Sequence, residues 1–416
     1  MVGKTNSRHT GLLCVLALVC AAMASAADWP RWRGPNGDGI SQETGLLKQW
    51  PAGGPPVVWQ VGVLGEGYST VAVVGGTIYT QGSLDGVEKA IALREADGSL
   101  LWAVPTSDQP AFRNDQGNGP RGAPTVRDGR VYVENGNGDV CCLDAETGKV
   151  VWHLNLARDL GGAPPNWGFS ESPLLLDNMA IVTPGGRGGT VAALNKDTGE
   201  VIWRSAEVQH VAEYSSPVAA VIGGIPEIVQ FAKDGVFGLT RDTGRLLWTY
   251  RHQKADNSIN ITTALVAEDH VLVSSAYGNG TGAAKITTAG GKQSAQEVYF
   301  VRDLDNHHGG IIKVGDYVYG TGSRGLICLS FLTGQIAWQD HSVGKGSVTV
   351  ADGMIYMLGE MRQLALVEAT AEGYREHGRI KIEDRGRPSW THPVVANGRL
   401  YVRNQGTLTA YDVTAH

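Results

Sequence analysis

Leu143 to Trp152 reads LDAETGKVVW, and the same pattern returns as LNKDTGEVIW at Leu194–Trp203 and as LTRDTGRLLW at Leu239–Trp248. Related copies are LREADGSLLW at Leu93–Trp102 and LSFLTGQIAW at Leu329–Trp338. Successive tryptophans of these copies are 50, 51, 45 and 90 residues apart, so the last step covers two periods. A fixed period of this length is the signature of a repeat architecture. The missing period predicts a degenerate copy, and Tyr299 in the run EVYFV fills it.

A second signature precedes each copy: an apolar strand, a tight turn and another apolar strand. Clear examples are TVRDGRVYV, VTVADGMIY and VVANGRLYV, at Thr125–Val133, Val348–Tyr356 and Val394–Val402. Asp-Gly and Asn-Gly suit two-residue hairpins, because both turn positions need a positive φ. Looser copies bring the total to eight strand pairs, and they begin near Val71, Pro173, Pro217, Ala264 and Ile311.

Two hairpin-forming signatures per repeat predict four antiparallel strands, which is one propeller blade. We therefore expect an all-β fold, an eight-bladed β-propeller spanning residues 57–416, with residues 27–56 as an N-terminal extension. The last repeat stops at LTAYD, Leu408–Asp412, without an outer strand. The segment VVWQV at Val57–Val61 supplies that strand and closes the ring, which hides two sheet edges.

The start of the chain has the order of a secretory signal peptide. Lys4 and Arg8 are basic, Gly11–Met23 is apolar, and Ala-Ser-Ala follows as a cleavage site. The apolar run is short for a membrane span. Cys20 raises the alternative of a lipoprotein, but a valine precedes it where a small residue is expected. We expect a signal peptide over residues 1–26, a periplasmic or extracellular protein, and no transmembrane span.

Charge argues against two classes of partner. The formal net charge is −6, and it becomes −8 once the signal peptide with its two cations is removed. A mildly acidic chain without a Lys/Arg run has no general attraction for nucleic acid or for an anionic membrane surface. We expect a monomer that binds neither.

Cys141, Cys142 and Cys328 remain after cleavage, and this odd number does not suit a disulfide scaffold. An adjacent-cysteine disulfide at Cys141-Cys142 is the alternative. Cys142, however, occupies the small-residue position that alanine takes in other repeats, and neighbours on a strand point to opposite faces. We expect three free thiols.

The repeated tryptophans are expected to dock blade on blade, since an indole buries a large area.

His307-His308 in DNHHGG could suggest a metal, but consecutive residues of an extended segment face opposite ways, and no zinc or calcium spacing is present. Glu171 in WGFSESP is open to three interpretations: a base, a ligand contact or a residue that braces a loop.

Chain direction locates the candidate site. The connections between an outer strand and the next inner strand end close to the propeller axis, so eight of them converge on one mouth of the central channel. They carry aromatic, polar and singly charged side chains, which a small-molecule or glycan site needs. The alternative is that these side chains only plug the channel. The predicted ligand-binding residues are Arg121, Trp167, Glu171, Tyr214, Asn306, His307, His308, Trp390 and His392, with Arg187 reaching the same mouth from a neighbouring loop.

The Thr-Gly and Trp repeat, the start DWPRWRGPNGDGIS at Asp28–Ser41 and the stretch NHHGG together resemble the pyrroloquinoline quinone (PQQ)-like propeller superfamily. The resemblance covers nearly all of the chain after the signal peptide. That superfamily includes quinoprotein alcohol dehydrogenases and the lipoprotein of the outer-membrane β-barrel assembly machine. The resemblance therefore implies the propeller fold, and for the enzymes a bound PQQ with calcium.

Two functions from different classes follow. In the quinoprotein dehydrogenases a Glu before the third strand of one blade binds calcium, whereas the comparable stretch here, TPGGRGG at Thr183–Gly189, has no acid. Their catalytic Asp beside a Trp has no counterpart that we can identify. These departures favour a non-catalytic binding propeller for a protein, glycan or small molecule. The alternative is a PQQ-dependent alcohol or sugar dehydrogenase. We assign no cofactor, no metal site and no catalytic residue from the sequence.

Overall fold

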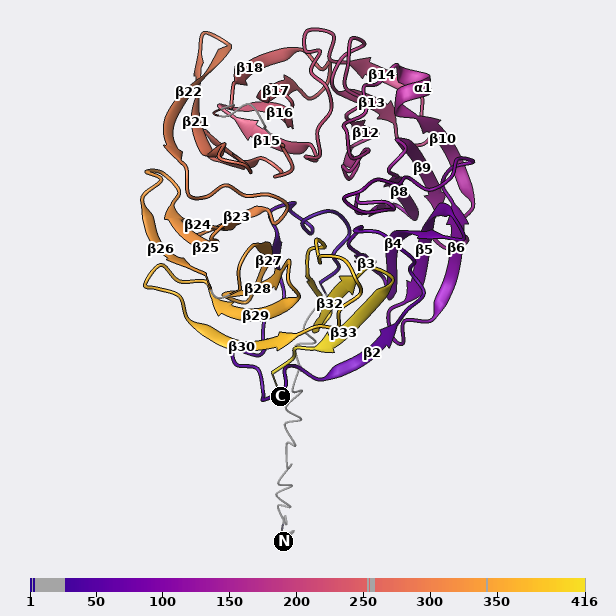
Figure 1. Cartoon of the computed structure of the whole chain (residues 1–416), viewed down its shortest axis with the longest axis vertical. Coiled ribbons are helices and arrows are strands. Elements are labelled where there is room, and N and C mark those ends of the chain that lie inside the picture. Colours follow the sequence, from indigo (N-terminus) through magenta and orange to yellow (C-terminus); the bar gives the residue numbers. More distant parts are fainter. Residues whose placement is uncertain (2, 4–26, 253, 255–258, 342, 416) are drawn as a thin grey trace.

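Eight sheets, each with four antiparallel strands, stand around a central axis in the computed structural model, and one of them gains a short fifth strand that pairs in parallel (Figure 1). The residues described are 1, 3, 27–252, 254, 259–341 and 343–415. The predicted eight-bladed β-propeller is therefore confirmed. The proposed signal peptide falls almost wholly outside the described residues.

In each blade the strands follow one another from the axis to the rim. The innermost strands are β3(Ala72–Val74), β7(Thr125–Arg127), β11(Leu174–Leu176), β15(Val218–Ile222), β19(Leu265–Ala267), β23(Ile311–Val314), β27(Gly346–Ala351) and β31(Val394–Ala396). The second strands are β4(Thr77–Leu84), β8(Arg130–Glu134), β12(Met179–Val182), β16(Ile225–Ala232), β20(His270–Ser275), β24(Tyr317–Gly322), β28(Met354–Gly359) and β32(Arg399–Asn404).

The third strands are β5(Val87–Arg94), β9(Asp139–Asp144), β13(Ala192–Asn195), β17(Gly235–Thr240), β21(Gly280–Ala289), β25(Gly325–Ser330), β29(Gln363–Glu368) and β33(Thr407–Asp412). The outer strands are β6(Leu100–Pro105), β10(Val150–Asn155), β14(Val201–Arg204), β18(Leu246–Tyr250), β22(Lys292–Val301), β26(Ile336–Asp340), β30(Glu376–Lys381) and β2(Val57–Val61). Two further elements lie outside this scheme, the short strand β1(Ile40–Ser41) and the single-turn helix α1(Leu156–Leu160).

The hairpin between the first and second strands uses the predicted turn chemistry. Asp128 and Gly129 have φ of 52° and 70°, and Asn397 and Gly398 have φ of 55° and 70°. Both central residues thus adopt the left-handed conformation that a tight hairpin of this type needs.

The repeated tryptophans join neighbouring blades, as predicted. Trp102 donates a hydrogen bond from Nε1 to the Ala145 carbonyl of the next blade at 3.2 Å, and Trp152 donates to the Lys196 carbonyl at 2.8 Å. Tyr299, in the degenerate copy, donates from its hydroxyl to the Phe331 carbonyl at 2.7 Å. Gly148 and Gly199, in the Thr-Gly turns that follow, leave room for the two indoles, because a Cβ there would meet the rings at 2.8 and 2.9 Å.

The ring closes through the N-terminal strand. β2 pairs antiparallel with β33, with Trp59 opposite Ala410 and Val61 opposite Leu408. Trp59 also donates from Nε1 to the Glu95 carbonyl of the first blade at 3.0 Å. The strand that precedes the first repeat is thus the outer strand of the last blade. No blade is left incomplete in the part of the chain described.

The segment from Trp29 to Ser41 crosses the central channel (Figure 1). Its hydrogen bonds reach six blades. The partner groups are the Val73 backbone, Val126 N, Thr263 Oγ1, the Ile311 carbonyl, the backbone of β27 and the Val395 carbonyl. The extension therefore acts as an internal tie, a role that the sequence did not predict.

All three cysteines are free and buried, which confirms the predicted redox state. Cys141 packs in the core between the first two blades, whereas Cys142 packs between the second and third. Burial raises the pKa of Cys142 and of Cys328 to about 11. The thiols therefore serve as small apolar side chains of the core.

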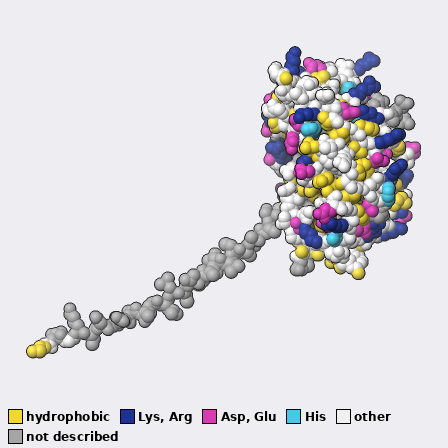
Figure 2. Space-filling view, turned by 90° about the vertical axis from the view of Figure 1, so that its left-hand side faces the viewer, with side chains coloured by type: hydrophobic (Ala, Val, Ile, Leu, Met, Phe, Trp, Pro, Cys, Tyr) yellow, Lys and Arg dark blue, Asp and Glu magenta, His cyan; other side chains and the backbone are white. Residues whose placement is uncertain are grey.

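The outer surface carries charges of both signs. In the side view of Figure 2, Lys/Arg and Asp/Glu side chains alternate over the rim, with hydrophobic groups between them. No helix among the described residues is long and apolar enough to cross a membrane.

Candidate functional site

A hollow of about 900 Å³, open to solvent, lies at one mouth of the channel. Seven of the eight connections between an outer and the next inner strand contribute to its wall, as the chain direction predicted. The residues from these connections are Tyr68, Arg121, Trp167, Ser170, Ser172, Tyr214, Ser216, Ile261, His307, His308, Trp390 and His392. The mixture of aromatic and polar groups is typical of a small-molecule site.

Aromatic side chains pair around the hollow. The rings of Tyr68 and Trp390 lie 4.8 Å apart, centroid to centroid, and Trp167 stacks on Tyr214 at 5.6 Å. The backbone N–H of Trp167 also donates to the Tyr214 hydroxyl at 3.2 Å. These contacts fix four aromatic platforms in place before any ligand enters.

Arg121 is the arginine in the lining. Its guanidinium lies 5.6 Å from the Tyr68 ring centroid and 5.9 Å from that of Phe112, and it donates to the Gly117 and Gly119 carbonyls. Cation–π contacts and two carbonyl bonds hold the side chain without a carboxylate. Burial lowers the pKa of Arg121, but the group stays charged at neutral pH.

Three histidines meet at the hollow. His392 donates from Nε2 to the His308 carbonyl at 2.8 Å, and the ring of His307 lies 5.4 Å from the rings of both His308 and Tyr277. Burial lowers the pKa of His307 and of His392 to about 4, and it lowers the pKa of His308 well below its ordinary value. All three imidazoles are therefore neutral at pH 7.

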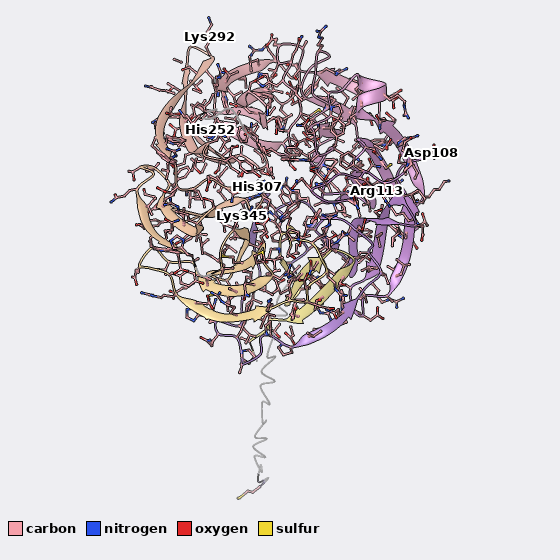
Figure 3. All side chains as sticks on the ribbon, viewed as in Figure 1. Asp108, Arg113, His252, Lys292, His307 and Lys345 are labelled. Carbon is pink, nitrogen blue, oxygen red and sulfur yellow. The ribbon has the colours of Figure 1, made fainter. Side chains whose placement is uncertain are left out.

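Two of these histidines differ in their hydrogen bonds. Figure 3 shows His307 and Lys345 close together near the centre of the ring, where His307 Nδ1 lies 3.3 Å from Lys345 Nζ. Both ring nitrogens of His308, by contrast, are buried without a partner. A neutral imidazole without partners beside a hollow can both donate to and accept from an incoming group.

Three predicted residues do not line the hollow. Glu171 and Asn306 are buried, 2% and 0% exposed. The side-chain oxygen of Asn306 accepts hydrogen bonds from the Gly310 N–H and the Thr262 hydroxyl. Arg187 lies on an exposed loop. Asn306 thus stabilises the connection that presents His307 and His308, and does not touch the hollow itself.

Glu171 accepts a hydrogen bond from the Thr183 N–H at 2.6 Å, and its own N–H donates to Glu134 Oε1 at 3.3 Å. The structure therefore shows the bracing role for this residue. Burial raises the pKa of Glu171 to about 7, and burial beside Glu171 raises that of Glu134. Two carboxyl groups so close and so buried are not both ionised.

The sequence interpretation missed Trp32, Gln116 and Tyr277, which also line the hollow. Trp32 comes from the N-terminal extension, where its Nε1 donates to Thr263 Oγ1 at 2.9 Å and its ring lies 4.5 Å from that of His392. The Trp-Pro-x-Trp start was a usable signal, because nothing in the repeat pattern required a second tryptophan there.

The residues do not fit a calcium-assisted quinone. Within the described part of the chain no three His, Cys, Asp or Glu side chains come together to hold a metal ion. No carboxylate belongs to the lining of the hollow. Calcium takes six to eight oxygen ligands, usually with carboxylates among them, and the hollow lacks such a set.

Comparison with known proteins agrees with the fold. Residues 88–340 match the PQQ-type family model described as outer membrane protein assembly factor BamB. The chain belongs to this family. In this BamB-type chain the eighth blade is completed by the N-terminal strand β2.

Curated relatives fall into two groups. The outer membrane protein assembly factor BamB of Yersinia pestis is 27% identical over 242 residues, 53% of this chain and 55% of that protein. The quinoprotein alcohol dehydrogenase PedH of Pseudomonas putida is 28% identical over 154 residues, 36% of this chain and 24% of that protein. The BamB-type chain thus spans about half of one relative and a quarter of the other.

Solved structures show the same fold. The BamB structure from Moraxella catarrhalis has a TM-score of 0.61 at 17% identity, covering 84% of this chain and 95% of that one. The quinohemoprotein alcohol dehydrogenase from Comamonas testosteroni has a TM-score of 0.68 at 14% identity, covering 95% and 82%. The likeness extends to the propeller as a whole.

Proposed function

We propose that this BamB-type chain is a secreted or periplasmic binding propeller, monomeric, that holds a ligand or a partner at the aromatic mouth of its channel. The observation that carries the proposal is the convergence of seven inter-blade connections on one hollow with preformed aromatic pairs. Such platforms beside convergent polar groups suit a small molecule, a glycan end or a short protein segment. Neither nucleic acid nor a membrane surface suits the charge pattern.

Geometry favours binding over catalysis. The hollow offers neutral imidazoles and serine hydroxyls, but no hydrogen bond among the described residues joins a lining imidazole to a lining serine, as an activated nucleophile would need. General base catalysis needs a group placed within hydrogen-bond reach of the proton that it removes. The buried Glu134–Glu171 pair lies outside the lining, and the Glu171 carboxyl accepts a hydrogen bond from the Thr183 N–H.

A quinoprotein dehydrogenase is the second candidate, and the sequence match to PedH favours it. Reconstitution with PQQ and calcium, followed by dye reduction over a panel of alcohols and sugars, separates the two. The binding proposal predicts no dye reduction above background. Turnover that depends on PQQ would reject it.

The binding proposal has its own test. We would screen neutral and acidic sugars, aromatic acids and peptides for thermal stabilisation of the purified chain, and repeat each hit with Trp390→Ala and His308→Ala. Arg187→Ala, on an exposed loop outside the lining, is the comparison variant. Hits should be lost in the two lining variants. Hits that survive in well-folded lining variants would place the site elsewhere.

A further inference from the structure

The channel contains arginines without ion pairs. Arg121, Arg33 and Arg403 have only neutral hydrogen-bond acceptors in the described structure, such as the Gly117, Ile311 and Ser69 carbonyls. Arg33 and Arg403 are 5% and 1% exposed. Buried cations are normally paired with anions. Three cations at one end of a channel create a positive potential there.

Two acids near the hollow already have cationic partners. Glu360 pairs with Lys345 at 2.8 Å and accepts from Trp390 Nε1 at 2.7 Å, while Glu213 pairs with Lys233 at 3.1 Å. Each of these carboxylates is matched by its own lysine.

Glu88 and Asp38 attract Arg121 and Arg33 through space but form no ion pair with them in the described part of the chain. Burial raises the pKa of Glu88 to about 7, so this carboxyl is only partly ionised at neutral pH. Arg121 therefore has no fully ionised carboxylate in contact and attracts an anion.

Arg33 does not line the hollow, but it lies close to His392, which does. A Cβ added at Gly310 would meet Arg33 Nη1 at 2.5 Å and the His392 ring at 3.2 Å, so the guanidinium lies beside a lining residue. That Nη1 is buried and has no hydrogen-bond partner. A second guanidinium thus lies near the lining, in addition to Arg121 in the wall.

The uncharged part of the lining restricts the ligand further. The aromatic faces of Tyr68, Trp167 and Trp390 offer flat apolar surface, and several hydroxyl and imidazole groups lie between them. A simple aromatic acid would leave these polar groups, and the unpartnered nitrogens of His308, without matching groups. A pyranose ring presents C–H groups to an aromatic face and hydroxyls at its edge, so it satisfies both.

We propose that the hollow takes a sugar that carries a carboxylate, a uronic acid either free or at the end of a glycan, with the carboxylate on Arg121. The inference rests on the proposed function and names the ligand class of that same site. An arginine can bond a carboxylate through two parallel N–H groups. The aromatic pairs hold the ring and the polar groups meet its hydroxyls.

The test is a matched ligand series measured by calorimetry on the purified chain. Methyl glucuronide carries the charge, glucuronamide replaces it with a neutral amide of similar shape, and benzoate carries the charge on an aromatic ring. A digalacturonate distinguishes a glycan end from a free sugar. We expect methyl glucuronide to bind about tenfold or more tightly than glucuronamide, since a charge-assisted bond is worth that much.

Variants assign the preference to Arg121. Arg121→Gln should abolish the preference for the charged sugar, Arg121→Lys should retain part of it, and Arg187→Gln, on an exposed loop, should leave it unchanged. Melting curves identify any variant that fails to fold. Equal binding of glucuronide and glucuronamide, or tighter binding of benzoate, would overturn the inference while leaving the site proposal in place. Loss of every ligand in the screen would instead reject the proposed function.

Discussion

The buried Glu134–Glu171 pair makes a prediction at the scale of single residues. Burial raises the pKa of Glu171 to about 7, above its ordinary value of 4.5. The folded state then holds a proton more tightly than the unfolded chain, so this pair favours folding at low pH and loses that advantage as the pH rises through about 7. Glu171→Gln keeps an acceptor for the Thr183 N–H and cannot ionise.

We therefore expect the free energy of unfolding of the wild type, relative to Glu171→Gln, to fall by about 2 kcal/mol from about pH 5 to about pH 8. Urea denaturation at each pH measures it. Taking the difference removes the opposite trend from the buried neutral histidines. Glu146→Gln, on an exposed turn, is the control and should follow the wild type. A difference that stays flat with pH would show that the pair is not protonated in the folded state.

Chain direction alone predicts which connections meet at the mouth, whereas ligand binding by their residues stays a prediction. Seven predicted residues line the hollow: Arg121, Trp167, Tyr214, His307, His308, Trp390 and His392. Glu171 and Asn306 come from the same connections, but their side chains turn inward to bond the backbone. Position in a loop does not tell which way a side chain points, because successive residues of an extended segment alternate.

At the scale of elements, the Trp–Gly contact is the joint between blades. Trp152 is 8% exposed, and a Cβ added at Gly199 would meet its ring at 2.9 Å. Trp152→Ala removes a buried indole and its bond to the Lys196 carbonyl, so we expect a loss of about 3 to 5 kcal/mol in the free energy of unfolding.

Trp167→Ala is the matched comparison, because Trp167 lines the hollow and is only partly buried. Its cost should be less than half of that for Trp152→Ala when both are measured by chemical denaturation. Equal costs would mean that Trp167 is also part of the scaffold. That result would favour the interpretation in which the mouth residues only plug the channel.

The strands were predictable because each repeat carries two sequence signatures. The hairpin turn marks the first two strands, and the Thr-Gly turn with its tryptophan marks the last two. The degenerate fifth repeat was found through the period, and Tyr299 makes the same kind of inter-blade bond as the tryptophans. The path of Trp29–Ser41 was not predictable. It belongs to no repeat, and its contacts join residues hundreds of positions apart, such as Arg33 with Ile311.

At the scale of the whole molecule, closure by β2 is the feature that separates a ring from an open array. Deletion of residues 27–61 removes β2 and leaves β33 as an unpaired edge, which invites association. We expect a lower melting temperature and concentration-dependent light scattering. Deletion of residues 27–56 keeps β2 and is the control for loss of the extension alone. A protein without residues 27–61 that melts and scatters like the full chain would reject closure.

The central claim is that ligands bind in the hollow at the mouth. Hydroxyl-radical footprinting, with and without saturating methyl glucuronide or the tightest binder of the screen, tests it most directly. Trp167, Tyr277 and Trp390 line the hollow, whereas Phe300 is exposed on the rim strand β22. The account predicts protection of the three lining residues and unchanged labelling of Phe300. Protection at Phe300 with unchanged labelling at the mouth would contradict it.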